Sequence, residues 1–252
     1  MRIDDALWPY LTGEKFSNGH RVRFQAESSD SQYITRQAWL CRHLAGKRVV
    51  HIGCVDHDIG QVRHKRQRGK WLHGALLEAS ARVLGVDIDA AGIEKLRDEF
   101  GMQDLLAADL LNDPCHEILC AQWDALLLGE VLEHIGDPVS FLRRIRERFA
   151  DNTRELLITV PNGFAREIQR LASQSIEAIN TDHRFWFTPY TIAKVCIDAG
   201  WRPEQLVLCR NGVIKHRSFV KNWRMQRKPL LRNNIIVRAV PMDAPPTRDT
   251  RN

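Results

Sequence analysis

Acidic side chains follow several apolar stretches of this sequence, and such groups can bind polar ligands. Asp87 follows the apolar segment 82–86, and Asp109 follows the short segment 105–108. A carboxylate in such a place can accept two hydrogen bonds from a ribose diol, each about 1.5–3 kcal/mol when charged. Asp109 is placed to accept from an exocyclic amine of adenine. Both acids could instead cap helices or turns. We favour ligand binding for Asp87, because Asp89 is the better cap, and both interpretations of Asp109 stay open.

A second group combines acids with histidines in the run GEVLEH, residues 129–134, and is followed much later by His183. Histidine has a reference pKa near 6.5 and is the natural general base. We therefore take His134 and His183 as candidate catalytic residues, with ordering of their loops as the alternative role. Two acids and two histidines can also bind a divalent metal, and this alternative ligand set is Glu130, Glu133, His134 and His183.

The elements that must position these groups follow from the hydrophobic pattern. Five apolar segments, rich in Val, Ile and Leu, predict strands at 47–52, 82–86, 105–107, 123–128 and 155–160. Helical spacing and caps predict helices at 31–44, 71–81, after Asp89, after Asp137-Pro138 and from Thr188-Pro189 to Gly200. Two further strands are expected at 205–209 and 235–239. This alternation predicts an α/β doubly wound sheet, whose strand-end loops meet along one edge.

The predicted domain organisation is a single α/β domain with short flanking segments. Residues 1–30 are expected to form an N-terminal cover, 31–240 the domain, and the proline-rich stretch 241–252 a disordered tail. The six cysteines contain no CxxC pair, which favours reduced thiols and a cytoplasmic protein. We expect neither a signal peptide nor a transmembrane segment.

Basic residues exceed acidic ones, and the formal net charge is +6. They are concentrated in the segments 63–70 and 215–232, which we expect to be polar connections. Each could bind the phosphates of RNA, a nucleotide sugar or a lipid headgroup, or could simply be a solvated loop. Trp223, within the second segment, could stack on a base or sugar, or anchor the loop.

Five stretches, in this order, resemble the class I S-adenosylmethionine-dependent methyltransferases, in particular bacterial members of the GEVLEH type. They are VVHIGC (49–54), LGVDID (84–89), AADLL (107–111), WDALLLGEVLEHIGDP (123–138) and LLITVPNG (156–163). The resemblance implies a Rossmann-like, seven-stranded, mostly parallel sheet with an antiparallel last strand, and S-adenosylmethionine as the cofactor. It also implies a cofactor site made by Gly53, Cys54, Val55, Asp87, Ile88, Asp109, Leu110, Gly129 and Glu130.

The first of these stretches departs from the family pattern. His51 stands where the family usually has an acid, and Val55 and His57 stand where it has glycines. Because a missing glycine limits how closely the backbone approaches a ligand, we expect an altered path for the 55–70 loop. The same residues argue against a nicotinamide enzyme, since Val55 and Asp58 occupy two glycine positions of the G-x-G-x-x-G fingerprint.

The expected function is methyl transfer to an oxygen of a small molecule or glycan precursor, and the net charge of +6 would suit an anionic acceptor. A first alternative is a metal-dependent enzyme of RNA, because ExxEH followed by DHRFWFT (182–188) is similar to the methyltransferases that act on the 3′-terminal 2′-hydroxyl of small RNAs. The Phe-Trp order after His183 departs from those enzymes. A second alternative, from another class, is a non-catalytic cofactor-binding scaffold.

Overall fold

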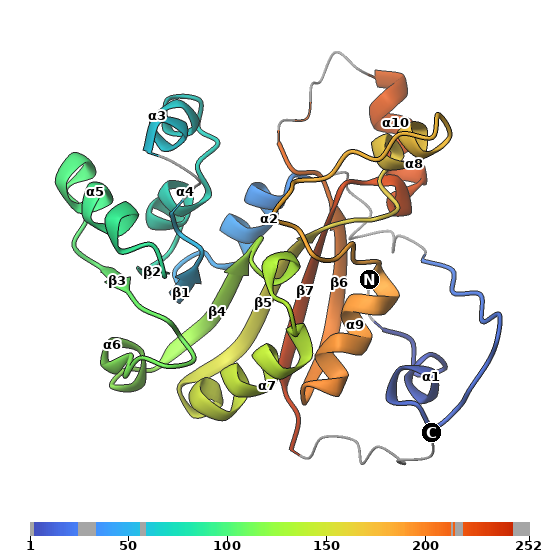
Figure 1. The fold of residues 1–252 in the computed structure, drawn as a ribbon, viewed down its shortest axis with the longest axis horizontal. Coiled ribbons are helices and arrows are strands. Elements are labelled where there is room, and N and C mark those ends of the chain that lie inside the picture. Colours follow the sequence, from blue (N-terminus) through green and yellow to red (C-terminus); the bar gives the residue numbers. More distant parts are fainter. Residues whose placement is uncertain (1–2, 25–33, 56–58, 213, 215–218, 244–252) are drawn as a thin grey trace.

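The centre of the protein is a seven-stranded sheet in the order β3-β2-β1-β4-β5-β7-β6 (Figure 1). The computed structural model describes residues 3–24, 34–55, 59–212, 214 and 219–243. The strands are β1 (Arg48–Ile52), β2 (Arg82–Asp87), β3 (Leu105–Ala107), β4 (Trp123–Gly129), β5 (Thr153–Pro161), β6 (Trp201–Cys209) and β7 (Asn234–Pro241). β1 to β5 run parallel, and β7 lies antiparallel between β5 and β6. The doubly wound sheet with an antiparallel last strand is therefore confirmed.

Helices cover both faces of this sheet. On one face lie α1 (Trp8–Thr12), α7 (Pro138–Phe149) and α9 (Pro189–Asp198); on the other lie α2 (Arg36–His43) and α4 (Leu72–Ala79). Near β3, α3 (Ile59–Gln67) packs against α5 (Ala90–Phe100). The remaining helices are α6 (His116–Leu119), α8 (Arg166–Ala172), α10 (Phe219–Arg227), η1 (Leu132–His134), η2 (Ala150–Asn152) and η3 (Pro229–Leu231).

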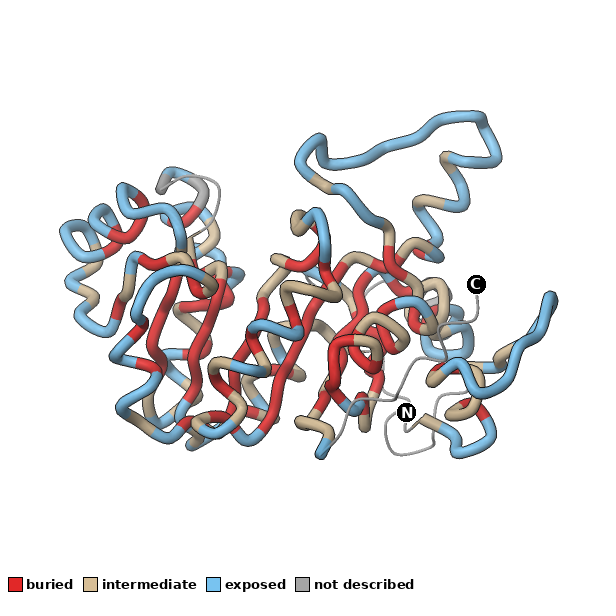
Figure 2. The backbone as a smooth tube through the Cα atoms, turned by 60° about the horizontal axis from the view of Figure 1, so that its bottom comes forward, coloured by how far each residue is buried: buried red, intermediate tan, exposed pale blue. Residues whose placement is uncertain are grey.

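Strand residues alternate between two hydrophobic clusters, one on each face. Leu126 and Leu128 of β4 pack on the face of α7 and α9, while Ala125 and Leu127 pack on the face of α2 and α4. All four are fully buried, and Figure 2 shows the strands as the buried layer of the molecule. Strands buried on both faces explain the unbroken apolar runs in the sequence.

Two helices begin as their sequence signals predict. Asp137 caps α7 by accepting a hydrogen bond from the Ser140 amide, and Pro138 occupies the first helical position. Thr188 and Thr191 form a reciprocal capping box at the start of α9. Since these caps satisfy amides that lack helical partners, both starts are fixed locally.

Several expected boundaries differ from the structure. α2 begins at Arg36, where the Thr35 hydroxyl accepts from the Ala38 amide, although the expected helix began at 31. The loop expected at 55–70 contains α3, and the polar connection expected at 215–232 contains α10. β6 begins at Trp201 rather than 205, with an irregular register between Pro203 and Gln205. His57 and residues 215–218 lie outside the described residues.

The flanking segments are partly described. α1 packs against α9, and the Lys194 ammonium donates to the Leu11 carbonyl. β7 extends to Pro241, and the Met242 amide donates to the Gly200 carbonyl. Most of the expected tail, from 244, lies outside the described residues.

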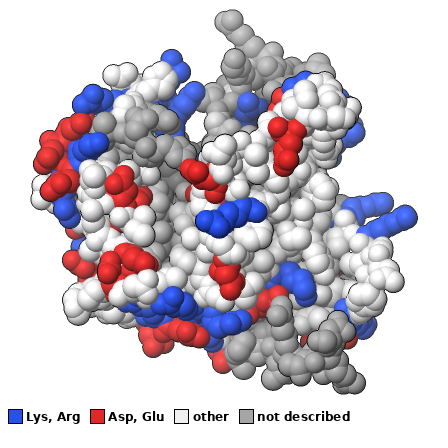
Figure 3. Space-filling model, in the orientation of Figure 1, with Lys and Arg blue, Asp and Glu red and all other residues white. Residues whose placement is uncertain are grey.

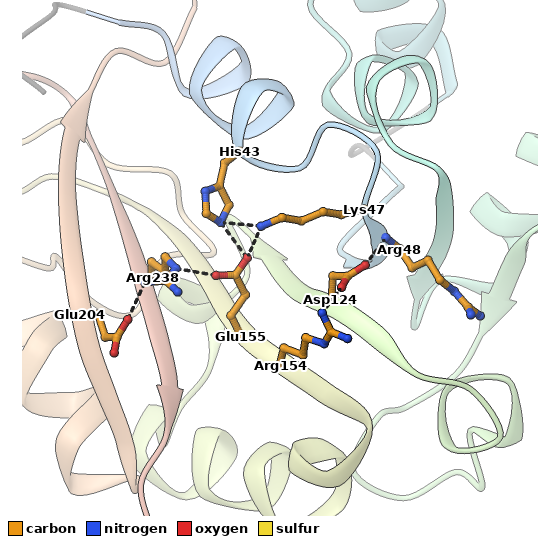
Figure 4. Close-up of polar contacts among 8 residues, drawn as sticks. All are labelled: His43, Lys47, Arg48, Asp124, Arg154, Glu155, Glu204 and Arg238. Carbon is orange, nitrogen blue, oxygen red and sulfur yellow. Dashed lines mark hydrogen bonds and ion pairs between the residues drawn. The ribbon is translucent and has the colours of Figure 1, made fainter. Parts of the chain in front are cut away.

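An ion network around the buried Glu155 carboxylate ties several elements together at the amino ends of the parallel strands. The Glu155 carboxylate of β5 accepts from His43, Lys47 and Arg238, and Arg238 also binds Glu204 (Figure 4). Beside it, Asp124 accepts from the Arg48 amide and pairs with Arg154. This network lies at the opposite end of the strands from the candidate ligand-binding residues.

The surface and the cysteines are unexceptional. Basic and acidic side chains are interspersed on the face shown in Figure 3. All six cysteines are free thiols. Within the described part of the chain, no helix is both long and apolar enough to cross a bilayer.

Candidate active site

Loops that follow the parallel strands meet at one edge of the sheet, as expected, and they carry the candidate residues except His183, which lies in the segment between α8 and α9. The turn after β1 is built on Gly53, whose φ is +77°. A Cβ at this glycine would lie 2.7 Å from Val131 Cγ2 in the loop after β4. Only glycine therefore allows the β1 and β4 loops to approach this closely.

Asp87 connects the loops after β1 and β2. Its Oδ2 accepts from the Val55 amide at 2.9 Å, and its Oδ1 accepts from the Asp89 amide at 3.1 Å. Burial raises the pKa of Asp87 against the lowering effect of these amides. Because a carboxylate offers about four acceptor sites, Asp87 retains capacity for two hydroxyl groups of a ligand.

The neighbours of Asp87 divide into exposed and buried side chains. Ile88 is 75% exposed at the open edge, an apolar surface that an adenine ring could cover. Cys54 is buried in a small cluster with Trp71 and Ile93, and burial raises its thiol pKa. Cys54 and Val55 can therefore contribute backbone groups to a ligand more readily than side chains.

Asp109 stabilises the turn that it begins. Its Oδ1 accepts from the Leu111 amide, its Oδ2 accepts from the Asn112 side chain, and these bonds lower its pKa. The next residue, Leu110, has its side chain in the main hydrophobic core. The structure thus brings Asp109 to the same edge as Asp87 and gives it a turn-capping role.

Glu130 adopts a left-handed backbone conformation after Gly129, with φ of +63°. Its Oε1 accepts from Asn234 at 2.6 Å and pairs with Arg36 at 3.1 Å. Arg36 also donates to the Thr159 hydroxyl. Glu130 therefore lies outside the group that the other three members of the alternative metal set form.

Glu133, His134 and His183 form the remaining cluster, with one ligand-type atom from each lying within 4.8 Å of the others. Two hydrogen bonds hold the 182–184 segment against η1: the His134 ring donates to the Asp182 carbonyl at 3.2 Å, and the Arg184 amide donates to the Glu133 carbonyl. The rings of His134 and His183 meet edge to face at 4.8 Å between centroids. The sequence motif thus correctly places both histidines side by side.

Hydrogen bonding indicates the tautomer of the His134 ring. A carbonyl oxygen can only accept, so the Nδ1 of His134 carries the hydrogen. The Nε2 of the neutral ring then keeps its lone pair. His134 is therefore arranged as a base or as a metal ligand.

Glu133 differs from the two histidines in the burial and the pKa of its side chain. Its side chain is fully buried, and within the described part of the chain neither carboxylate oxygen has a hydrogen-bond partner. Burial, reinforced by the negative charge of Glu130, raises its pKa to about 8. A carboxylate in this state is stabilised by a proton or by a cation.

Two buried histidines behind the Gly53 turn escaped the sequence analysis as a pair. The Nδ1 atoms of His51 in β1 and His73 in α4 lie 3.1 Å apart. Burial lowers the pKa of both rings, and that of His73 falls to about 4. A Cβ at Gly129 would lie 2.7 Å from the His51 Nε2. The two uncharged histidine rings therefore pack against Gly129 at the base of the site.

Arg36 is a second functional candidate that sequence reasoning missed. Its guanidinium lies between Glu130 and Thr159 with little exposure. An arginine and an acid at this place match the carboxylate and ammonium groups of an amino-acid moiety. Its position in the first turn of α2 is far from the strand-end motifs, and no local pattern marks it.

The sequence matches the methyltransferase domain family over residues 34–206. The chain therefore belongs to this family. Together with the seven-stranded sheet, this membership confirms the expectation of an S-adenosylmethionine-dependent methyltransferase with a Rossmann-like fold. No curated protein matches the chain.

Solved structures share the fold at low sequence identity. The small RNA methyltransferase HEN1 has a TM-score of 0.56 and 16% identity, over 92% of this chain and 28% of its own. The methyltransferase in complex with the Trm112 activator of Haloferax volcanii has a TM-score of 0.50 and 14% identity, over 95% and 96%. A cyclopropane-fatty-acyl-phospholipid synthase-like protein from Lactobacillus casei has a TM-score of 0.50 and 15% identity, over 94% and 100%. These likenesses show the fold alone.

Proposed function

We propose that this protein transfers the methyl group of S-adenosylmethionine to a hydroxyl oxygen of a small molecule or glycan precursor. The observation that supports it is the His134 ring, which donates through Nδ1 to the Asp182 carbonyl and keeps Nε2 available at the strand-end edge. The cofactor supplies an electrophilic methyl group, so the protein must align the acceptor and remove its proton.

Each part of the edge has a role in this proposal. Asp87 accepts from the ribose hydroxyls, Ile88 covers the adenine, and Asp109 accepts from the adenine amine. The turn Gly53–Val55 with Gly129, Glu130 and Arg36 holds the methionine part. His134 takes the acceptor's proton at Nε2, and His183 positions the ring of His134 through their edge-to-face contact.

The test separates cofactor binding from catalysis. S-adenosylhomocysteine should bind the purified protein in calorimetry, and His134→Gln should keep this affinity while lowering kcat about 100-fold or more. The acceptors are a panel of phenols, sugars and hydroxy acids, including anionic members. An unchanged kcat in the variant contradicts the role of His134. Cofactor binding without turnover across the panel favours a non-catalytic scaffold.

A second candidate function follows from Glu133, whose buried carboxylate lacks a partner among the described residues beside two histidines. A mixed carboxylate and imidazole set suits Mn²⁺, Fe²⁺, Co²⁺ or Zn²⁺. Such an ion could bind the hydroxyls of a ribose, which would make the 3′-terminal 2′-hydroxyl of an RNA the acceptor. The likeness to HEN1, described as a small RNA methyltransferase, agrees with this candidate in fold only.

Cation binding decides between the two candidates. For the RNA enzyme, Mn²⁺ or Co²⁺ should bind the protein in calorimetry and His183→Ala should abolish this binding. Activity should then appear on a short RNA and disappear with a chelator. Activity on a small hydroxylated acceptor that survives chelation supports the first candidate.

The cytoplasmic location stays a prediction.

A further inference from the structure

A pocket of about 440 Å³ opens beside the histidine cluster, between the end of β5, α8 and the segment that follows α8. Its walls are mainly apolar and include Gly163, Ile168, Ala172, Ser175, Ile176 and Trp186. This volume lies within the range of small-molecule sites, about 300–1,000 Å³. The pocket is therefore large enough for one ligand of modest size.

Trp186 connects this pocket to the candidate catalytic residues. Its side chain lines the pocket, and its ring meets the ring of His183 edge to face at 6.1 Å between centroids. The Gly163 amide donates to the Phe187 carbonyl. This bond fixes the Trp186 segment beside the end of β5, so the pocket and the histidine cluster share a wall.

The chemistry of the walls selects the kind of occupant. Among the described residues that line the pocket, the single charged one is Glu177, and none is lysine or arginine. Ile176, in the pocket wall, is 49% exposed. Exposed apolar surface in a cavity favours an apolar ligand. A ribonucleotide would bring phosphates toward an acidic group without a compensating cation, whereas a neutral ring would bury both its own and the protein's apolar surface.

We propose that this pocket binds the apolar, ring-containing body of the methyl acceptor and directs its hydroxyl toward His134. This inference rests on the proposed methyltransferase function and narrows its substrate class to aromatic or alicyclic alcohols. Trp186 offers an aromatic face for the ring. Ile168 and Ile176 offer aliphatic contacts, and the small side chain of Ala172 leaves the space open.

The test fills the pocket without touching the candidate catalytic residues. Ala172→Trp places a large side chain at its wall, and Gln174→Trp makes the same change two residues later, at a position that does not line the pocket. The probe is 2-naphthol, titrated by calorimetry in the presence of S-adenosylhomocysteine. We expect Ala172→Trp to weaken naphthol binding at least tenfold, while Gln174→Trp keeps it and both variants keep the affinity for S-adenosylhomocysteine.

The outcomes distinguish the pocket from the wider function. Absence of naphthol binding by the unmodified protein, or equal binding by Ala172→Trp, overturns the pocket assignment. Displacement of naphthol by a dinucleotide but by no ring alcohol also overturns it, in favour of an RNA acceptor. If S-adenosylhomocysteine fails to bind while naphthol binding still depends on Ala172, the proposed methyltransferase function fails and the pocket stands.

Discussion

Glu133 couples protein stability to pH at the scale of a single residue. Its pKa of about 8 in the folded protein compares with about 4.3 for an unperturbed glutamate. The folded state therefore binds a proton that the unfolded chain releases. Stability falls as the pH rises between these two values and is constant above the higher one.

The isosteric change Glu133→Gln should remove this pH dependence. In a chelating buffer, the variant should become more stable than the unmodified protein by a few kcal/mol as the pH rises from 5 to 8, at about 1.4 kcal/mol per pKa unit. Urea unfolding at both pH values measures it. The exposed Glu94→Gln serves as the control and should change stability equally at the two pH values. A constant difference for Glu133→Gln would show that this carboxyl titrates normally.

Asp87 gives a prediction about ligand affinity. If it holds the ribose hydroxyls, Asp87→Ala should weaken S-adenosylhomocysteine binding at least tenfold, about 1.4 kcal/mol. The same change at exposed Asp98 should have no effect. Circular dichroism should first show that the variant is folded, because Asp87 also fixes the Val55 and Asp89 amides. An unchanged dissociation constant would remove Asp87 from the proposed site.

The position of a candidate site residue could be predicted from the sequence where that residue belongs to a local motif. Asp87, His134 and His183 all reach the same edge because strand ends and a helix cap surround them. Arg36 and the His51–His73 pair could not be predicted, because their contacts join residues far apart in the chain. The contacts of Glu130 with Arg36 and Asn234 could not be predicted either, because those residues are also far from it in the chain.

At the scale of the element, Glu155 joins β5 to α2 and β7. Burial alone would raise its pKa, but the hydrogen bonds from His43, Lys47 and Arg238 outweigh burial and lower the pKa to about 2. The stabilisation is complete above the unfolded value near 4.3 and disappears as the pH falls toward 2.

Glu155→Gln should therefore cost about 3 kcal/mol at pH 7, because it removes the buried charge that pairs with three partly exposed donors. The cost should shrink as the pH approaches 2. Guanidinium unfolding at pH 7 and pH 3 measures both values. Glu204→Gln is the matched comparison: its partially exposed pair with Arg238 should contribute less than about 1 kcal/mol. Equal effects of the two changes would contradict the proposed importance of burial.

Elements with strong apolar periodicity and caps were predictable, and those held by a few tertiary contacts were not. α7 and α9 carry aspartate or threonine caps followed by proline, and both start where expected. α3 is strongly basic, and its single fully buried anchor among the described side chains is Val62. α10 is likewise mostly polar and has one buried side chain in its described part, Met225. Such helices form because tertiary packing offsets weak local preference.

At the scale of the whole molecule, β7 holds the sheet together beyond β5. It pairs with β5 on one side and β6 on the other, and β6 pairs with β7 alone. A chain that ends at Arg227 should therefore fail to fold, because β6 would lose its strand partner and β5 would lose one of its two. Circular dichroism and limited proteolysis would test this. A chain that ends at Asp243 is the control and should remain folded; a cooperative transition in the shorter chain would contradict the expectation.

The central place of β7 also has a consequence for protein synthesis. β5 leaves the ribosome about 80 residues before β7 does, which at about 5–20 residues per second takes roughly 4 to 16 seconds. Throughout this interval β5 presents an apolar, unpaired edge, a template for intermolecular pairing. Slow translation of the segment between them, or a shortage of chaperones, should therefore reduce the yield of native protein even though the finished fold is stable.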